Sequence, residues 1–342
     1  MDDHNREASL PHHPVLYHEI IHALQPARDG LYVDGTLGAG GHAWGLLESS
    51  SPNGRLLGMD VDPQALELAH QRLAPFGNRV EIVRASYITL REQLSKMGWQ
   101  SVNGILLDLG VSSMQFDNSE RGFSFKSEAS LDMRFDPANP VRASDLVNGL
   151  PEDELAELLY KYGEERASRR IARAIVKGRP IETTSQLAEI VAQVSAAGRR
   201  SAHKQRRGGR ERIHVATRTF QALRIAVNRE LDALERVLPQ ALEALTPGGR
   251  LAVISFHSLE DRIVKQFFRL ESRDCLCPSK QPVCTCGHKA KLVEITRKPI
   301  RPGPDEINRN PRARSALLRV AERVRDPIED WINQERNTHH NS

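Results

Sequence analysis

The sequence has few aromatic residues, few cysteines and no long apolar run. Phe, Trp and Tyr make up 5% of the 342 residues, so aliphatic side chains must supply most of the core that a hydrophobic content of 39% allows. No segment approaches the roughly 20 consecutive apolar residues of a membrane-spanning helix. The first residues are polar and acidic, unlike a signal peptide. These absences predict a cytoplasmic chain with no membrane partner.

The four cysteines all fall within twelve residues, at positions 275, 277, 284 and 286. Disulfides are rare in cytoplasmic proteins, so a disulfide framework is not expected. Two C-x-C pairs could close a tetrahedral thiolate site around zinc, although the usual spacing is C-x-x-C. The sequence leaves three interpretations open for Cys275, Cys277, Cys284 and Cys286: a zinc site, free thiols or a redox pair.

Charge is balanced over the whole chain but is concentrated in one segment. The formal net charge is +4, whereas residues 199–212 are dense in Arg and Lys and hold a single Glu. Such a segment suits the phosphate backbone of a nucleic acid. A solvated surface loop is the alternative interpretation.

Four glycines gather near the N-terminus. A β-prone run at 31–33 leads into Asp34, the glycines are at positions 35, 38, 40 and 41, and a helical segment follows at 41–49. A strand, a glycine-rich turn and a helix bring backbone N–H groups close to a nucleotide-like ligand at a helix N-terminus. Glycine density alone is equally compatible with a loop that binds nothing.

An acid at the end of the next strand favours the ligand-binding interpretation. The run 55–60 ends in Asp60, where a carboxylate can accept hydrogen bonds from both hydroxyls of a ribose. Asp62 precedes Pro63 and is expected to cap the following helix. The loop lacks the third glycine of the pattern G-x-G-x-x-G, which argues against a nicotinamide oxidoreductase. Its pattern resembles the S-adenosylmethionine loop of class I methyltransferases.

Strands and helices alternate through the first part of the chain. The predicted strands are 31–34, 55–60, 80–84 and 103–109, and the predicted helices are 41–49, 63–73 and 88–97. This alternation predicts a parallel sheet whose ligand binds at the carboxyl ends of the strands. Tyr87 follows the third strand and could stack on an adenine or pack in the core. Polar residues follow the fourth strand and are expected at the same edge: Asp108, Ser112, Ser113 and Gln115.

The alternation stops after residue 116 and resumes about 100 residues later. Helical periodicity covers 152–162, 164–177 and 185–194. A long helix is predicted at 218–245, with strands at 250–256, 291–295 and 315–321 and a helix at 258–270. The predicted fold is α/β, a Rossmann-like and mostly parallel sheet of seven strands with an inserted all-helical domain. The predicted parts are 1–116 and 216–325 for the sheet domain, 117–215 for the insertion and 326–342 for a flexible tail.

Several long motifs resemble one family, the bacterial small-subunit (16S) rRNA cytosine-N4 methyltransferases. The resemblance spans roughly residues 12–324. One departure is Met114, where the family commonly has Pro, and this change affects the turn that orients Gln115. The motifs are 106–113 (LLDLGVSS) with Gln115, 121–125 (RGFSF), 131–134 (LDMR), 216–225 (ATRTFQALRI), 255–262 (SFHSLEDR) and 310–315 (NPRARS).

The resemblance implies S-adenosylmethionine as cofactor and 16S rRNA, or the small ribosomal subunit, as partner. It implies N4 methylation of a cytidine in the decoding region (P site), with the inserted domain helping to recognise RNA. A homodimer is left open. The cofactor-binding residues that it implies are Gly40, Gly41, His42, Asp60, Tyr87, Asp108 and Gln115.

The exocyclic amine of cytosine is a poor nucleophile because its lone pair is delocalised into the ring. Acceptors for its N–H protons would localise that pair, and the candidates are Asp108, Ser112 and Ser113. Asp108 could serve the cofactor instead. Phe123 and Phe125 could form a stacking platform for a base swung out of its stack, or could anchor the inserted domain.

Two further functions stay open from the residues alone. One is a non-catalytic RNA-binding or ribosome-assembly factor that uses a nucleotide-like ligand structurally. The other is a methyltransferase that acts on another amino-group substrate. Asn228 and His257 are additional candidates for the site, and a protonated His257 could equally contact RNA phosphate.

Overall fold

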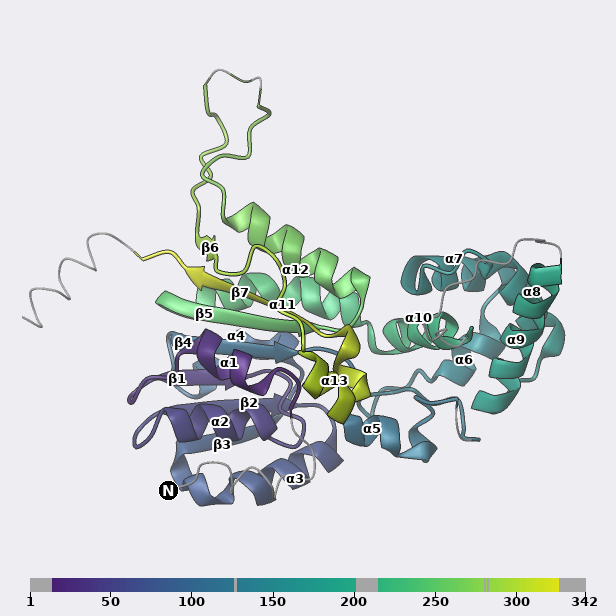
Figure 1. Ribbon diagram of the computed structural model, residues 1–342, viewed down its shortest axis with the longest axis horizontal. Helices are drawn as coiled ribbons and strands as arrows, with labels where there is room; N and C mark the ends of the chain where they lie inside the picture. The colour runs from purple at the N-terminus through teal and green to yellow at the C-terminus, as the bar shows by residue number, and fades with distance from the viewer. Residues whose placement is uncertain (1–13, 126–127, 201–214, 280, 282, 326–342) are drawn as a thin grey trace, which may run out of the picture. The chain divides into compact units, whose positions relative to one another are not determined.

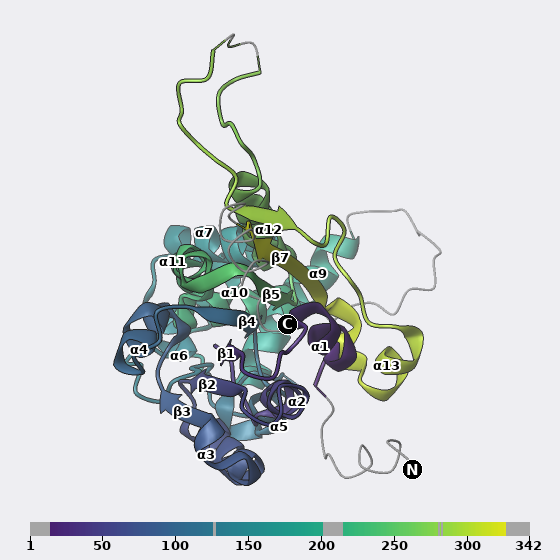
Figure 2. The same cartoon turned by 90° about the vertical axis from the view of Figure 1, so that its left-hand side faces the viewer.

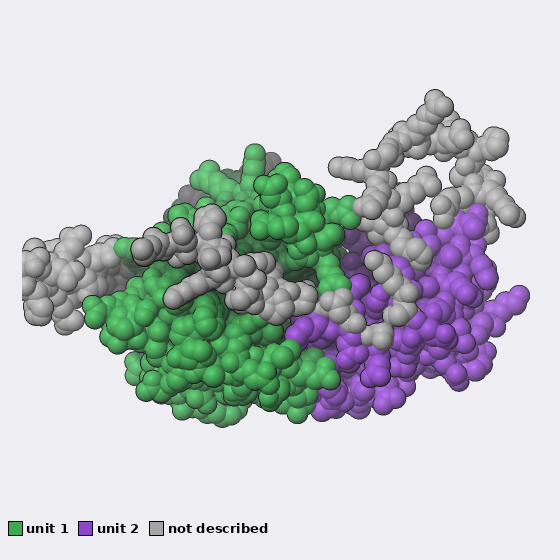
Figure 3. Space-filling model, turned by 60° about the horizontal axis from the view of Figure 1, so that its bottom comes forward, with its two compact units in different colours: residues 1–110, 232–342 green, residues 111–231 purple. Residues whose placement is uncertain are grey.

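The computed structural model describes residues 14–125, 128–200, 215–279, 281 and 283–325. The chain forms two compact units, which Figure 3 colours separately. The sheet unit comprises residues 1–110 and 232–342, and the helical unit comprises residues 111–231. The predicted insertion, 117–215, therefore lies inside the helical unit, which extends beyond it at both ends.

The sheet unit is built on seven strands in the order β3-β2-β1-β4-β5-β7-β6 (Figure 1). Strands β1 to β5 pair in parallel, and β7 is antiparallel to both β5 and β6. This arrangement confirms the predicted mostly parallel sheet of seven strands. The strands are β1 Leu31–Asp34, β2 Arg55–Asp60, β3 Val80–Arg84, β4 Val102–Asp108, β5 Leu245–Ser255, β6 Leu292–Glu294 and β7 Leu317–Arg323.

Helices cover both faces of the sheet, and each face has its own apolar core (Figure 2). On one face pack α1 Tyr17–Leu24, α2 Gly41–Ser49 and α3 Pro63–Leu73. On the other pack α4 Leu90–Lys96, α11 Glu230–Ala244 and α12 Ser258–Glu271. Aliphatic residues dominate both cores, as the scarcity of aromatics predicts. A short helix, α13 Pro304–Arg309, precedes β7.

The helical unit has a third core of its own. Its helices are α5 Ser113–Asp117, α6 Ala143–Gly149, α7 Glu152–Gly163, α8 Ser168–Gly178, α9 Thr184–Arg200 and α10 Thr217–Asn228. The single long helix predicted at 218–245 is wrong, because α10 ends at Asn228 and α11 begins at Glu230. Arg229 between them takes a left-handed conformation (φ 50°, ψ 40°), which ends a helix by turning the chain out of its axis.

Local signals account for the helix starts in the sheet unit. The Asp62 side chain accepts a hydrogen bond from the N–H of Gln64 at 3.0 Å, and Pro63 occupies the first position of α3. The predicted N-cap role of Asp62 is therefore confirmed. Among the described residues, none of the helices combines the length and the apolar character needed to cross a bilayer.

Candidate active site

The glycine-rich loop joins β1 to α2 and depends on glycine for two different reasons. Gly38 (φ 52°) and Gly40 (φ 76°) adopt the left-handed backbone conformation that side chains disfavour. Gly41 has ordinary dihedrals, but a Cβ there would lie 2.4 Å from Cγ of Pro14. The loop is thus closed by packing as well as by turn geometry.

Asp60, at the end of β2, fixes the loop to the sheet. One carboxylate oxygen accepts the N–H of Gly38 at 2.8 Å, and the other accepts the N–H of Asp62 at 2.9 Å. Each oxygen retains a second acceptor site, so this role is compatible with binding a ribose hydroxyl. Burial raises the pKa of Asp60, although these two hydrogen bonds oppose the rise.

Acids end three adjacent strands in the order β2, β1, β4: Asp60, Asp34 and Asp108. Burial, with the nearby charge of Asp60, raises the pKa of Asp34 to about 7. Burial and the charges of Asp34 and Glu260 raise the pKa of Asp108 well above its ordinary value. A row of buried and half-buried carboxylates creates a negative potential that a cation would relieve.

His42 and Asp108 face each other without a hydrogen bond. Nε2 of His42 lies 3.7 Å from Oδ2 of Asp108. Among the described residues, both ring nitrogens of His42 and Oδ1 of Asp108 are buried without a hydrogen-bond partner. Burial lowers the pKa of His42 to about 4, so the imidazole is neutral at pH 7. Buried polar atoms without partners are costly in a native structure, and a ligand is one physical reason for keeping them.

Thr36 connects the glycine loop to β4. Its hydroxyl accepts the N–H of Asp108 at 2.6 Å, and the N–H of Gly35 donates to the carbonyl of Leu106 at 2.9 Å. The N–H of Thr36 in turn donates to the Asp34 carboxylate at 3.1 Å. The loop, Asp34 and Asp108 therefore form one connected unit at the carboxyl ends of β1 and β4.

Tyr87 begins the short 3-10 helix Tyr87–Thr89 after β3 and packs against the core on the α4 face. A Cβ on Gly35 would lie 3.2 Å from Cβ of Tyr87, so the tyrosine borders the glycine loop. The structure thus gives Tyr87 a packing role next to the loop, and adenine stacking stays a prediction.

Ser112 and Gln115 belong to the helical unit, where they hold each other. The Ser112 hydroxyl accepts the N–H of Gln115 at 3.2 Å, and the Gln115 side-chain oxygen accepts the N–H of Ser112 at 3.1 Å. This capping box begins α5 and fixes the turn despite Met114. The side chain of Ser113 lies outside the described part of the structure, as do residues 201–212 of the basic segment.

The other candidates in the helical unit have structural partners. Phe123 is buried and its ring centroid lies 5.6 Å from that of Phe135. Phe125 meets the ring of Phe220 edge-on at 5.2 Å. Asn228 accepts the N–H of Phe135 and donates to the carbonyl of Met133, both at 2.7 Å. The anchoring interpretation of the two phenylalanines therefore has direct support.

His257 caps α12 in the sheet unit. Its Nδ1 accepts the N–H of Glu260 at 3.4 Å, while the Glu260 carboxylate accepts the N–H groups of Phe256 and His257.

Three residues near the site were not selected from the sequence: Glu260, Asp34 and Thr36. A signal was available for Asp34, because it ends a strand directly before the glycines, as Asp60 ends the next strand.

The residues present fit a cationic cofactor with a nucleoside part. The carboxylates of Asp34 and Asp108 suit positive charge, and Asp60 has acceptor sites left for hydroxyls. S-adenosylmethionine carries a sulfonium and an ammonium group together with an adenosine. The neutral His42 adds ring nitrogens that have no partner within the described chain.

Known proteins resemble this chain along most of its length. The model of the MraW methylase family matches residues 9–324. A "Ribosomal RNA small subunit methyltransferase H" from Heliobacterium modesticaldum is 51% identical over 319 residues, covering 92% of this chain and 99% of that protein. The protein of the same name from Syntrophus aciditrophicus is 52% identical over 316 residues, covering 92% and 98%.

A solved structure of an rRNA methylase from Streptococcus thermophilus is 12% identical with a TM-score of 0.39, covering 90% of this chain and 94% of that one. The family match bears out methyl transfer and the predicted cofactor, S-adenosylmethionine. On the strength of that match and of relatives identical at half of their positions over nearly their whole length, this chain belongs to the MraW methylase family.

Proposed function

We propose that this protein methylates N4 of a cytidine in the decoding region (P site) of 16S rRNA, in the cytoplasm, with S-adenosylmethionine as methyl donor. The observation that carries the proposal is the small-subunit rRNA methyltransferase name shared by relatives that match nearly the whole chain. The motifs around Asp108 and in the helical unit support the choice of cytosine N4, because they resemble the enzymes that modify this atom.

The sheet unit holds the cofactor. The bound cofactor supplies an electrophilic methyl group on a cationic sulfonium. Asp34 and Asp108 provide negative charge for its cationic groups, and Asp60 accepts hydrogen bonds from its ribose. Gly40 is the N-cap of α2, and Gly41 and His42 begin this helix. The first backbone N–H groups of a helix have no intrahelical partner and can bind polar groups of a ligand.

Asp108 is the best candidate for the group that activates the substrate amine. Methylation of N4 releases one of the two amine protons, and a carboxylate that accepts it increases the electron density on nitrogen. Burial raises the pKa of Asp108, which makes its carboxylate a stronger base than an exposed aspartate. The Ser112 hydroxyl already accepts the N–H of Gln115, so Ser112 is the weaker candidate.

The basic segment 199–212 is the proposed RNA contact. Arg and Lys side chains that neutralise phosphates release bound counterions, so binding weakens as salt rises. Neutralising Arg206, Arg207 and Arg210 together should weaken RNA binding and flatten its salt dependence. An unchanged salt slope would assign this segment to a solvated loop.

The decisive test is transfer of labelled methyl from S-adenosylmethionine to small ribosomal subunits that lack the modification, followed by nucleoside mass spectrometry. Label on N4 of cytidine supports donor, substrate and reaction together. Tight cofactor binding without transfer to subunits or free rRNA would favour another amino-group substrate or a non-catalytic assembly factor. Preference for NAD over S-adenosylmethionine in a binding assay would overturn the reaction class.

A further inference from the structure

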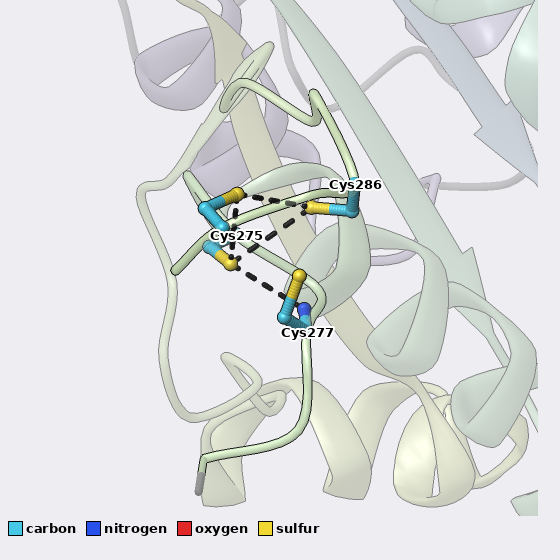
Figure 4. Close-up of side chains that lie close together, drawn as sticks. Cys275, Cys277 and Cys286 are labelled. Atoms are coloured by element: carbon cyan, nitrogen blue, oxygen red, sulfur yellow. Dashed lines mark hydrogen bonds between the residues drawn. The ribbon is translucent and has the colours of Figure 1, made fainter. Parts of the chain in front are cut away.

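The connection between α12 and β6 is a long loop, residues 272–291, that projects from the sheet unit (Figures 1 and 2). Cys275 and Cys277 lie on its outgoing limb, and Cys284 and Cys286 on its returning limb. The four sulfur atoms all lie within 4.8 Å of one another. Figure 4 shows the side chains of Cys275, Cys277 and Cys286 converging.

The sulfur spacing matches a tetrahedral metal site. Four thiolates bonded to zinc at about 2.3 Å place their sulfurs about 3.8 Å apart. Here three Sγ–Sγ distances are 3.4 Å for Cys275 and Cys284, 3.6 Å for Cys284 and Cys286, and 3.8 Å for Cys275 and Cys286. The sulfur of the fourth cysteine, Cys277, lies within 4.8 Å of the other three. A disulfide needs about 2.05 Å, and all four cysteines are free. The geometry therefore fits metal coordination better than it fits a redox pair.

Backbone N–H groups point at the sulfurs. The N–H of Leu276 donates to Sγ of Cys286 at 3.3 Å, and the N–H of Thr285 donates to Sγ of Cys277 at 3.4 Å. Each of these bonds crosses from one limb to the other. Such donors stabilise a thiolate and orient it toward a metal, as outer partners do in known metal sites. Free thiols do not require hydrogen-bond donors aimed at their sulfur atoms.

The described residues of the loop form no apolar core that could hold the two limbs together. Leu276 is 38% exposed and Val283 is 68% exposed. At its base, Nδ1 of His288 contacts the carbonyl of Arg273 and the N–H of Lys291 donates to the carbonyl of Glu271, both at 2.8 Å. A segment without hydrophobic burial needs a cross-link to keep one conformation, and a structural metal provides one.

We propose that Cys275, Cys277, Cys284 and Cys286 bind one zinc ion as a closed tetrathiolate site that fixes the α12–β6 loop. All four coordination positions are taken by cysteine, so the ion has no open position for substrate or water and its role is structural. This site does not depend on the proposed rRNA substrate. Its residues are separate from those that hold the cofactor, so the two functions can be tested independently.

The test uses the full chain purified without chelators or added metal. Elemental analysis should find one zinc per chain, and replacement by Co²⁺ should give the visible absorption of a tetrahedral cobalt tetrathiolate. Cys275→Ser and Cys284→Ser should each lower zinc affinity by more than tenfold. Thr285→Ser is the matched control, because it alters the same loop but keeps all four thiols and the backbone donors, and it should retain the metal.

Binding of S-adenosylmethionine by the serine variants shows whether the rest of the sheet unit is folded, and it should stay as in the unchanged protein. Folded protein without zinc, with no cobalt spectrum and four thiols reactive toward a thiol reagent, would overturn the proposal in favour of free thiols. If only two thiols react before reduction and all four react after it, the proposal is overturned in favour of a redox pair.

Discussion

The residues that sequence reasoning selected in the two units differ in how their polar atoms are satisfied. In the sheet unit, His42 and Asp108 keep buried atoms without hydrogen-bond partners, and burial displaces the pKa values of both. In the helical unit, Ser112, Gln115 and Asn228 are engaged in caps and loop contacts. Asp108, Ser112 and Gln115 nevertheless belong to one motif of the family resemblance.

The difference separates binding residues from supporting ones. Unpaired buried polar groups and raised carboxylate pKa values cost stability, so a fold keeps them where a ligand will use them. Side chains that complete local hydrogen bonds stabilise the chain without a ligand. We therefore expect substitutions at the strand ends to impair binding or activity without lowering stability, and substitutions in the helical unit to lower stability more than activity.

The largest effect is expected from Asp108→Asn. Loss of the carboxylate should slow methyl transfer by about 10²–10⁴-fold, the range for a general base, without lowering the free energy of unfolding. Single-turnover transfer with saturating cofactor measures the first quantity, and denaturant titration measures the second. The control is Asp153→Asn, at an exposed position in the first turn of α7. A rate like that of the unchanged protein would remove Asp108 from the proposed chemistry.

Phe123→Ala should destabilise the helical unit by about 3–5 kcal/mol, because it empties a buried site in that core. Cofactor affinity should stay unchanged, since the proposed cofactor residues other than Gln115 lie in the sheet unit. Denaturant unfolding and calorimetry measure the two effects. Tyr160→Ala is the control, because that side chain is 65% exposed. Full stability with impaired transfer would revive the role of Phe123 as a stacking platform.

Asp34 should make the cofactor-free protein less stable as pH rises. The pKa of Asp34 is about 7 in the folded protein and 3.8 ordinarily. Below about pH 4 the carboxyl is uncharged in both the folded and the unfolded state, so the folded state pays nothing for burying it. Between about pH 4 and 7 the unfolded state loses the proton first, and the free energy of unfolding falls. Asp34→Asn should therefore be more stable than the unchanged protein at pH 8, by at most about 4 kcal/mol, with little difference at pH 4. Denaturant titrations at both pH values measure this difference. An equal effect at both would mean that ionisation is not its cause.

Asp60→Ala should lower affinity for S-adenosylmethionine by about 1–3 kcal/mol, because ribose hydroxyls lose an acceptor and the glycine loop loses its tie to β2. Isothermal titration calorimetry measures the loss. The exposed Glu67 of α3 provides the control as Glu67→Ala. Undiminished affinity would refute the assignment of Asp60 to the ribose.

The smallest effect should come from Ser112→Ala. Losing this N-cap should cost about 0.5–2 kcal/mol of stability and change the transfer rate only severalfold. Ser112→Asp should restore the cap and the stability. If instead the rate fell as far as in Asp108→Asn while stability held, Ser112 would belong with the catalytic residues and the contrast between the units would break.

Much of the fold could be predicted because its signals are local. Alternating apolar runs and helical segments placed the strands through β4 within a residue, and the Asp62-Pro63 pair identified the start of α3. The break at Arg229 could not be predicted. No Gly or Pro marks it, and only the contacts of Asn228 with the chain around residues 133–135 show why α10 ends there.

The sequence by itself determined the order of the elements, the glycine loop and the acids at the strand ends, because these depend on neighbours along the chain. Tertiary structure alone decided which of those acids are coupled, since pairing β1 with both β2 and β4 brings Asp34 between Asp60 and Asp108. It also decided that the four cysteines converge. Their spacing permits a shared site, but only the fold of the loop brings sulfurs from both limbs within reach of one ion.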